Sequence, residues 1–116
     1  MQDYTDILSL KKGYIEKLKE LETETNKLKT LAKDVAEKEC AYRKAKAVSF
    51  LTLIAAKNSA TAAKILMDGE TAQIRLFFKI SDGVLKSAKE NIKRIHSNIE
   101  AYRTLISIAK SEINIR

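Results

Sequence analysis

The sequence predicts an all-α protein, a long antiparallel helical hairpin of the coiled-coil type with a short helical elbow. The 116 residues include no proline and only three glycines, so few positions would interrupt a helix. Lysine, glutamate, alanine, leucine and isoleucine dominate the composition, as is typical of long helices. Apolar residues recur at alternating spacings of four and three over two long stretches, which returns them to one side of a helix.

The first helix is expected at about residues 4–57. One column of its apolar side is uninterrupted and comprises Ile7, Tyr14, Leu21, Leu28, Val35 and Tyr42. The second column is expected at Tyr4, Lys11, Leu18, Thr25, Ala32 and Glu39, and polar residues interrupt it. Gly13 is the only glycine in this stretch and costs about 1 kcal/mol relative to alanine, which predicts a weak start of the helix.

An elbow is expected at about residues 58–69 and a second helix at about 70–113. Asn58-Ser59 offers a stop and an N-cap, and Ala60 begins a short helical piece. Asp68-Gly69-Glu70 predicts a second break, with acidic residues at the start of the next helix. The apolar side of that helix is expected at Ile74, Phe78, Ser81, Leu85, Ala88, Ile92, Ile95, Ile99, Tyr102, Ile106, Ala109 and Ile113.

Residues 1–116 are expected to form a single helical domain, in which each helix covers the apolar side of the other. Two helices leave further apolar residues beside the contact, namely Leu8, Ile15, Leu31, Phe77, Leu105 and Ile108. The prediction is therefore that two copies associate into a four-helix assembly or that a partner covers these residues.

Positive charge is concentrated around the elbow. The formal net charge is +7, and residues 41–80 carry seven basic against two acidic residues. Such a surface favours nucleic acid, an acidic membrane or an acidic protein as partner. Phe50, Phe77 and Phe78 lie among these residues and could stack on unpaired bases, although Phe50 and Phe78 are more simply explained by packing. The candidate contact residues are Arg43, Lys44, Lys46, Lys57, Lys64, Arg75 and Lys79.

No catalytic or metal-binding motif is present, so neither enzymatic activity nor a cofactor is expected. His96 is the only histidine and has no cysteine or histidine three or four residues away. Cys40 is the only cysteine, which suits a reducing cytoplasm. The amino terminus lacks the pattern of a signal peptide, and the apolar run at 47–56 is about half the roughly 20 residues that cross a bilayer.

The elbow resembles one found in small helical proteins of tailed bacteriophages that are encoded among recombination and replication genes. The residues that carry the resemblance are Ala41 to Ala47, Phe50-Leu51, Ala63, Asp68, Glu70, Ala72, Arg75, Leu105 and Glu112. It spans about residues 38–112 and implies a non-enzymatic accessory protein in a bacterial cytoplasm that binds DNA or a nucleoprotein machine. The polar elbow departs from that pattern where a glycine is expected.

Three functions remain open at this point. The first is binding of nucleic acid, or of a nucleoprotein complex, through the basic elbow. The second is inhibition of a bacterial defence complex by protein–protein contact, as an anti-CRISPR protein does. The third is a structural coiled-coil adaptor. Binding to a membrane surface is less favoured, because the aliphatic residues are committed to the helix contact.

Overall fold

The structure is a computed structural model that describes residues 4–115. These residues form three helices, α1 (Tyr4–Ala55), α2 (Ala60–Glu70) and α3 (Ala72–Ile115), and contain no strand. The chain divides into two compact units. We call the first the terminal unit, which comprises Met1–Leu28 and Ser87–Arg116. The second, Lys29–Lys86, is the elbow unit.

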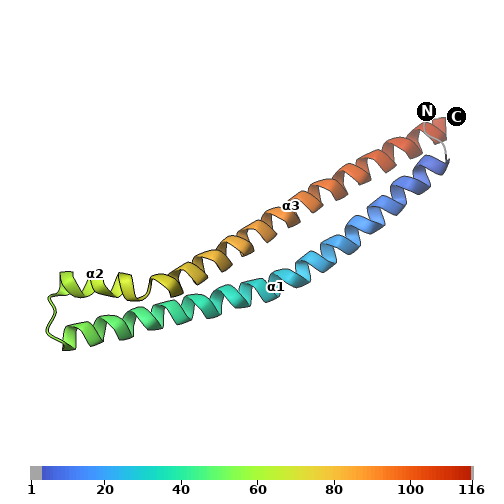
Figure 1. The fold of residues 1–116 in the computed structure, drawn as a ribbon. Coiled ribbons are helices and arrows are strands. Elements are labelled where there is room, and N and C mark those ends of the chain that lie inside the picture. The colour runs from blue at the N-terminus through green and yellow to red at the C-terminus, as the bar shows by residue number, and fades with distance from the viewer. Residues whose placement is uncertain (1–3, 116) are drawn as a thin grey trace. The chain divides into compact units, whose positions relative to one another are not determined.

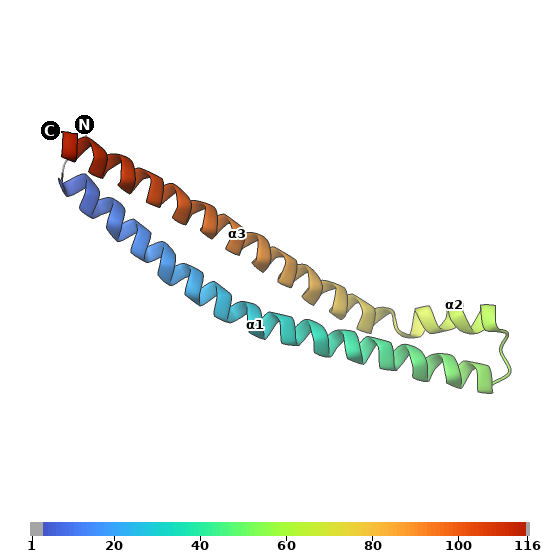
Figure 2. The same ribbon diagram turned by 180° about the vertical axis from the view of Figure 1, so that it is seen from behind.

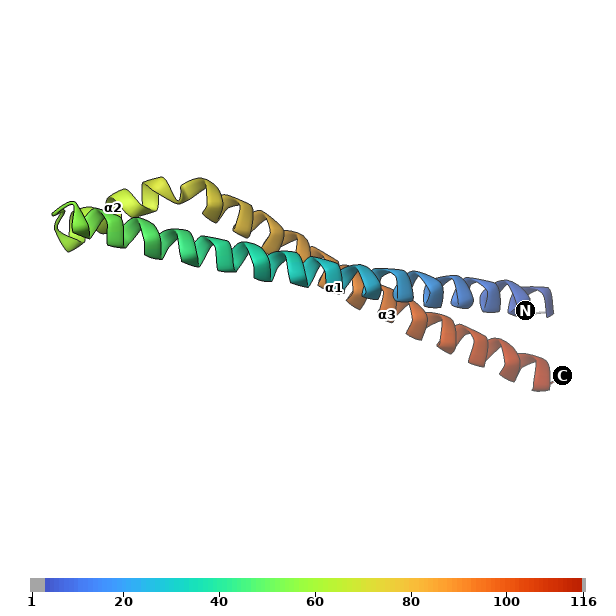
Figure 3. The same ribbon diagram turned by 90° about the horizontal axis from the view of Figure 1, so that it is seen from below.

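In each unit a segment of α1 lies beside an oppositely directed segment of α3 (Figures 1 and 2). In the elbow unit the chain turns after α1, and α2 leads back into α3 (Figure 3). The predicted all-α class and antiparallel hairpin with a helical elbow are thus confirmed. A single domain over residues 1–116 and association into a four-helix assembly stay predictions.

The predicted contact residues of α3 are largely correct. From Phe78 to Ile113 every one of them is buried or half-buried, and only Ile74, at 36% exposure, lies outside the contact. Ile95 is fully buried and forms the core of the terminal unit together with Ile7, Ile99 and Ala109. The core of the elbow unit consists of Val35, Ala63, Met67 and Leu85, with the buried polar residues Thr71 and Ser81.

On α1 one predicted column is correct and the other is wrong. Every described member of the column from Ile7 to Tyr42 is buried or half-buried. Leu18 is 38% exposed, and most of its predicted column is exposed as well. The side chain of Tyr4 lies outside the described residues. The second column that faces inward lies one residue earlier than predicted. Its members are all half-buried: Leu10, Lys17, Glu24, Leu31, Lys38 and Ala45.

The aliphatic stems of lysine and glutamate can lie along an apolar contact while their charged ends reach water, which explains the shift. Those ends are satisfied within α1 itself: Lys17 pairs with Glu20 at 3.0 Å and Lys38 with Asp34 at 2.8 Å. Leu31, expected beside the contact, therefore lies in it. The other five residues expected outside are exposed, as predicted: Leu8, Ile15, Phe77, Leu105 and Ile108.

Gly13 has a packing role that its position in the sequence does not indicate. A Cβ atom added there would lie 2.7 Å from Cε1 and Oη of Tyr102 on α3. Carbon atoms in favourable contact are about 3.5–4.0 Å apart, so only a glycine lets the ring lie this close to α1. The helix α1 runs through Gly13 without a break, from Tyr4 onward, and the weak start expected around Gly13 stays a prediction.

The turn after α1 has the hydrogen bonds of a Schellman motif. The amide of Asn58 donates to Leu53 O at 3.2 Å and that of Lys57 to Ile54 O at 2.9 Å. Lys57 has φ 65°, the left-handed conformation that usually selects glycine. Ser59 then caps α2 by accepting a hydrogen bond from the amide of Ala62 at 3.1 Å, as predicted.

The second break lies later than expected. Residues 68–70 continue α2, and the chain bends at Thr71, whose hydroxyl donates to Met67 O at 2.8 Å. Gly69 does not adopt a positive φ, so nothing at that residue ends the helix. Asp68 and Glu70 consequently lie in the last turn of α2 and not in the first turn of α3, where the helix dipole would have stabilised their negative charges.

Candidate basic interface

All seven basic residues identified in the sequence belong to the elbow unit. Arg43, Lys44 and Lys46 lie on α1, and Lys57 lies in the turn. The others are Lys64 on α2 and Arg75 and Lys79 on α3. Lys46 is half-buried and the other six are exposed.

Most of these charges have no acidic partner. Among the described residues, Arg43 is the only one of the seven in an ion pair, at 2.7 Å from Glu39. Elsewhere in residues 4–115, half of the fourteen lysines and arginines are ion-paired along their own helix. The difference follows from the scarcity of acidic residues at 41–80, and it leaves cations available for an external anion.

An aromatic pair brings two of the cations together across the helix contact. The rings of Tyr42 on α1 and Phe78 on α3 stack with centroids 6.0 Å apart. Lys46 Nζ lies 5.2 Å from the centroid of Tyr42, and Lys79 Nζ lies 5.6 Å from that of Phe78. Each contact contributes about 0.5–1 kcal/mol at an exposed position and holds the ammonium group near the contact line.

Helical spacing places five of the seven on one face of the elbow unit. When two helices pack antiparallel, the residue that comes directly after a contact position in the sequence lies to one side of the helix pair. This side is the same for both helices. Arg43 follows Tyr42, and Lys46 is one turn further along α1. Lys79 follows Phe78 on α3 and Arg75 lies one turn before Lys79, and Lys64 follows buried Ala63 on α2.

We call these five residues the basic face: Arg43, Lys46, Lys64, Arg75 and Lys79. Lys44 instead precedes the half-buried Ala45 and lies on the opposite side of the helix pair, and Lys57 lies beyond the end of the helix. The two remain near the basic face in sequence without being part of it.

Two of the three phenylalanines pack within the elbow unit, as expected, and the third is exposed. Phe78 is half-buried against Tyr42, and Phe50 is half-buried, so both take part in packing. Phe77 is 50% exposed, but it precedes the contact position and therefore lies on the side opposite the basic face. Sequence reasoning missed Tyr42 as the partner that positions Lys46, although the spacing of four residues could have indicated it.

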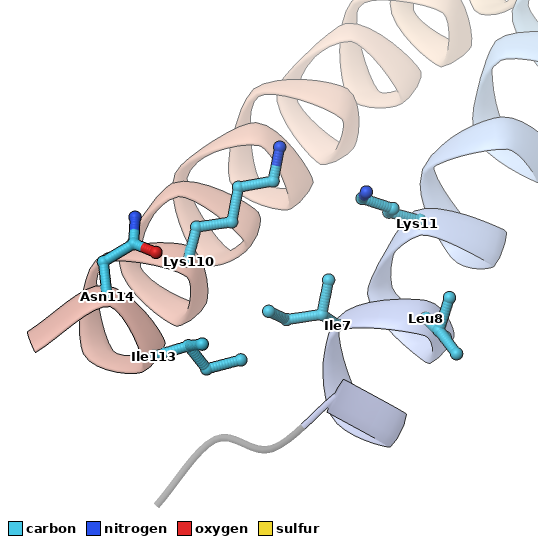
Figure 4. Close-up of a pocket in the computed structure, with 6 residues that line it drawn as sticks. All are labelled: Ile7, Leu8, Lys11, Lys110, Ile113 and Asn114. Carbon is cyan, nitrogen blue, oxygen red and sulfur yellow. The ribbon is translucent and has the colours of Figure 1, made fainter. Parts of the chain in front are cut away.

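The terminal unit has a small hollow between the beginning of α1 and the end of α3 (Figure 4). Its volume is about 190 Å³, and Lys11 and Lys110 reach into it from opposite helices, with Ile7 and Ile113 lying between the two helices. The remaining lining residues are Leu8 and Asn114. Apart from the amines of Lys11 and Lys110, none of these side chains carries a group that titrates or acts as a nucleophile.

Arg103 is a cation of the terminal unit that is already engaged. Its Nε donates to Tyr14 Oη at 3.2 Å, and its guanidinium pairs with Glu100 at 2.9 Å. The pKa of Arg103 is raised above its ordinary value, first by the hydrogen bond to Tyr14 and then by electrostatic attraction to Tyr14 and Glu100. The Arg103 guanidinium is therefore charged at neutral pH.

The described residues give little support to a metal site or a membrane-spanning segment. No group of three or more metal-binding side chains occurs within 4–115. His96 and Cys40 are both exposed. No described helix combines the length and the apolar character needed to cross a membrane. The chain matches no protein-family model, no curated protein and no solved structure.

Proposed function

We propose that this protein binds the phosphate backbone of nucleic acid, without catalysis, through the basic face of the elbow unit. What supports the proposal most is that four of the five cations of the basic face have no ion pair among the described residues. A cation that is not paired within the protein can neutralise a phosphate without first breaking a salt bridge, and it releases the condensed counterion.

The expected mode of binding is contact with phosphates rather than with bases. Phe78 and Tyr42 stack on each other, so neither ring face is presented as a platform for an unpaired base. Lys46 and Lys79 extend from that stack as point charges, which carry no sequence information. Binding should therefore be nearly independent of sequence and should weaken steeply with salt.

The test compares two triple variants that lose the same charge. Lys46→Gln/Arg75→Gln/Lys79→Gln removes three cations from the basic face. Lys11→Gln/Lys89→Gln/Lys110→Gln removes three cations of the terminal unit, which have no ion pair among the described residues either. The affinity for a labelled duplex is measured by fluorescence anisotropy over a series of salt concentrations, and helicity is checked by circular dichroism.

For the basic-face variant, the slope of log affinity against log salt should fall by about 3, since each phosphate contact contributes about 0.9. The terminal-unit variant should keep the slope of the original chain. If the two variants lose the same amount, the binding reflects net charge and not the basic face. If no binding occurs at low salt, the proposed function is wrong.

A further inference from the structure

We infer that the hollow between α1 and α3 in the terminal unit binds a small phosphate monoester that carries a short apolar or aromatic group (Figure 4). We call this site the terminal hollow, and its lining residues are Ile7, Leu8, Lys11, Lys110, Ile113 and Asn114. The inference does not rest on nucleic-acid binding, because residues of the terminal unit alone carry it.

The terminal hollow contains two cations and no acid. Lys11 on α1 and Lys110 on α3 reach into it from opposite helices (Figure 4). Neither has an ion pair among the described residues. Two like charges that share one hollow repel each other, and an anion between them replaces this repulsion by two attractions. The site therefore favours an anion that both ammonium groups can contact.

The number of positive charges selects the kind of anion. A phosphate monoester balances both lysines, because it is mainly a dianion above its second pKa of about 6. A carboxylate or a phosphate diester carries a single negative charge, which leaves one ammonium group uncompensated. Lysine also suits phosphate chemically, since its ammonium group is a compact point charge with three hydrogen-bond donors.

The rest of the terminal hollow suits an apolar group. Ile7 is buried and Ile113 is half-buried, and both lie between the two helices (Figure 4). Lys11 and Lys110 are exposed, so a phosphate held by them stays near water while its organic group lies against the isoleucines.

The size of the terminal hollow limits that organic group. Its volume is about 190 Å³. A cavity of about 150 Å³ lined by aliphatic and aromatic side chains holds one benzene molecule. Pockets that enclose drug-sized ligands measure about 300–1,000 Å³, so a nucleotide or a larger cofactor is too big. The expected ligand therefore has one ring or a short alkyl chain.

Isothermal titration calorimetry of the full chain at about pH 8 and in about 0.1 M salt tests the inference with three probes. Phenyl phosphate has the dianion and the ring. Methyl phenyl phosphate keeps the ring but is a diester with one charge fewer, and inorganic phosphate is a dianion without the ring.

Phenyl phosphate should bind at least about 10-fold more tightly than either of the other probes. Against the diester, this factor corresponds to the loss of one charge-assisted contact. Against inorganic phosphate, it corresponds to burial of on the order of 60 Å² of the ring. If phenyl phosphate does not bind, or binds no more tightly than the diester and inorganic phosphate, the inference is wrong.

Two matched variants locate the binding site. Lys110→Gln removes a cation of the terminal hollow, and Lys89→Gln removes another cation of α3 that is unpaired among the described residues and lies about 30 Å away along the helix. Circular dichroism checks the helicity of both.

Lys110→Gln should weaken the binding of phenyl phosphate at least about 10-fold and remove the preference for the monoester over the diester, because one cation is left. Lys89→Gln should change the affinity by less than about 2-fold, since its charge is screened over that distance. Equal losses in the two variants, or a monoester preference that survives Lys110→Gln, would show that the terminal hollow is not the site.

Discussion

Replacing a helix glycine by alanine should have opposite effects at two positions of this chain. Neither Gly13 on α1 nor Gly83 on α3 has a positive φ, so alanine fits the backbone at both. In a helix interior, alanine is favoured over glycine by about 1 kcal/mol. Nothing lies within 4 Å of a Cβ added at Gly83, and Gly83→Ala should therefore raise the free energy of unfolding by about 1 kcal/mol.

At Gly13 a packing cost opposes the same gain. The added Cβ would lie 2.7 Å from two atoms of the Tyr102 ring and 2.8 Å from a third, so the ring must move by roughly 1 Å to reach ordinary contact. Tyr102 is half-buried, and overpacking of this kind costs about 1–3 kcal/mol. Gly13→Ala should consequently lower the free energy of unfolding by about 1 kcal/mol.

A double-mutant cycle assigns that loss to the ring. In a Tyr102→Ala background the obstacle is absent, and Gly13→Ala should then stabilise the chain by about 1 kcal/mol, as Gly83→Ala does. Urea unfolding followed by circular dichroism, at one protein concentration for all variants, supplies the free energies. If Gly13→Ala stabilises the chain while Tyr102 is present, the close approach does not constrain this position.

Two further changes test the turn and the core. Lys57→Gly should raise the free energy of unfolding by about 1 kcal/mol in the same urea assay, because a side chain in the left-handed conformation costs about 1–2 kcal/mol. Lys64→Gly removes the same charge from the interior of α2 and should lower the free energy of unfolding by about 1 kcal/mol. Ile95→Ala should lower the free energy of unfolding by about 2–5 kcal/mol, because Ile95 is fully buried. Ile108 is 50% exposed, so Ile108→Ala should change the free energy of unfolding by less than about 1 kcal/mol. Destabilisation by Lys57→Gly, or equal effects of the two isoleucine changes, would contradict the described turn and core.

The sequence by itself determined which residues of α3 face the contact. Its apolar column is nearly continuous, so only one side of the helix could be buried. The cap at Ser59 was also predictable, because a hydroxyl before a helix satisfies an amide through local geometry alone. The excess of cations at 41–80 was likewise visible in the sequence, since it depends on counting and not on contacts.

The tertiary structure alone decided how the two helices meet. On α1 the inner column contains Lys17, Glu24 and Lys38, and only the position of α3 shows that their stems are half-buried while Leu18 is exposed. The close approach of Tyr102 to Gly13 and the stack of Tyr42 on Phe78 depend on the register between residues far apart in the chain. Helical periodicity fixes the phase of each helix, but it contains no information about which residues of the other helix lie opposite.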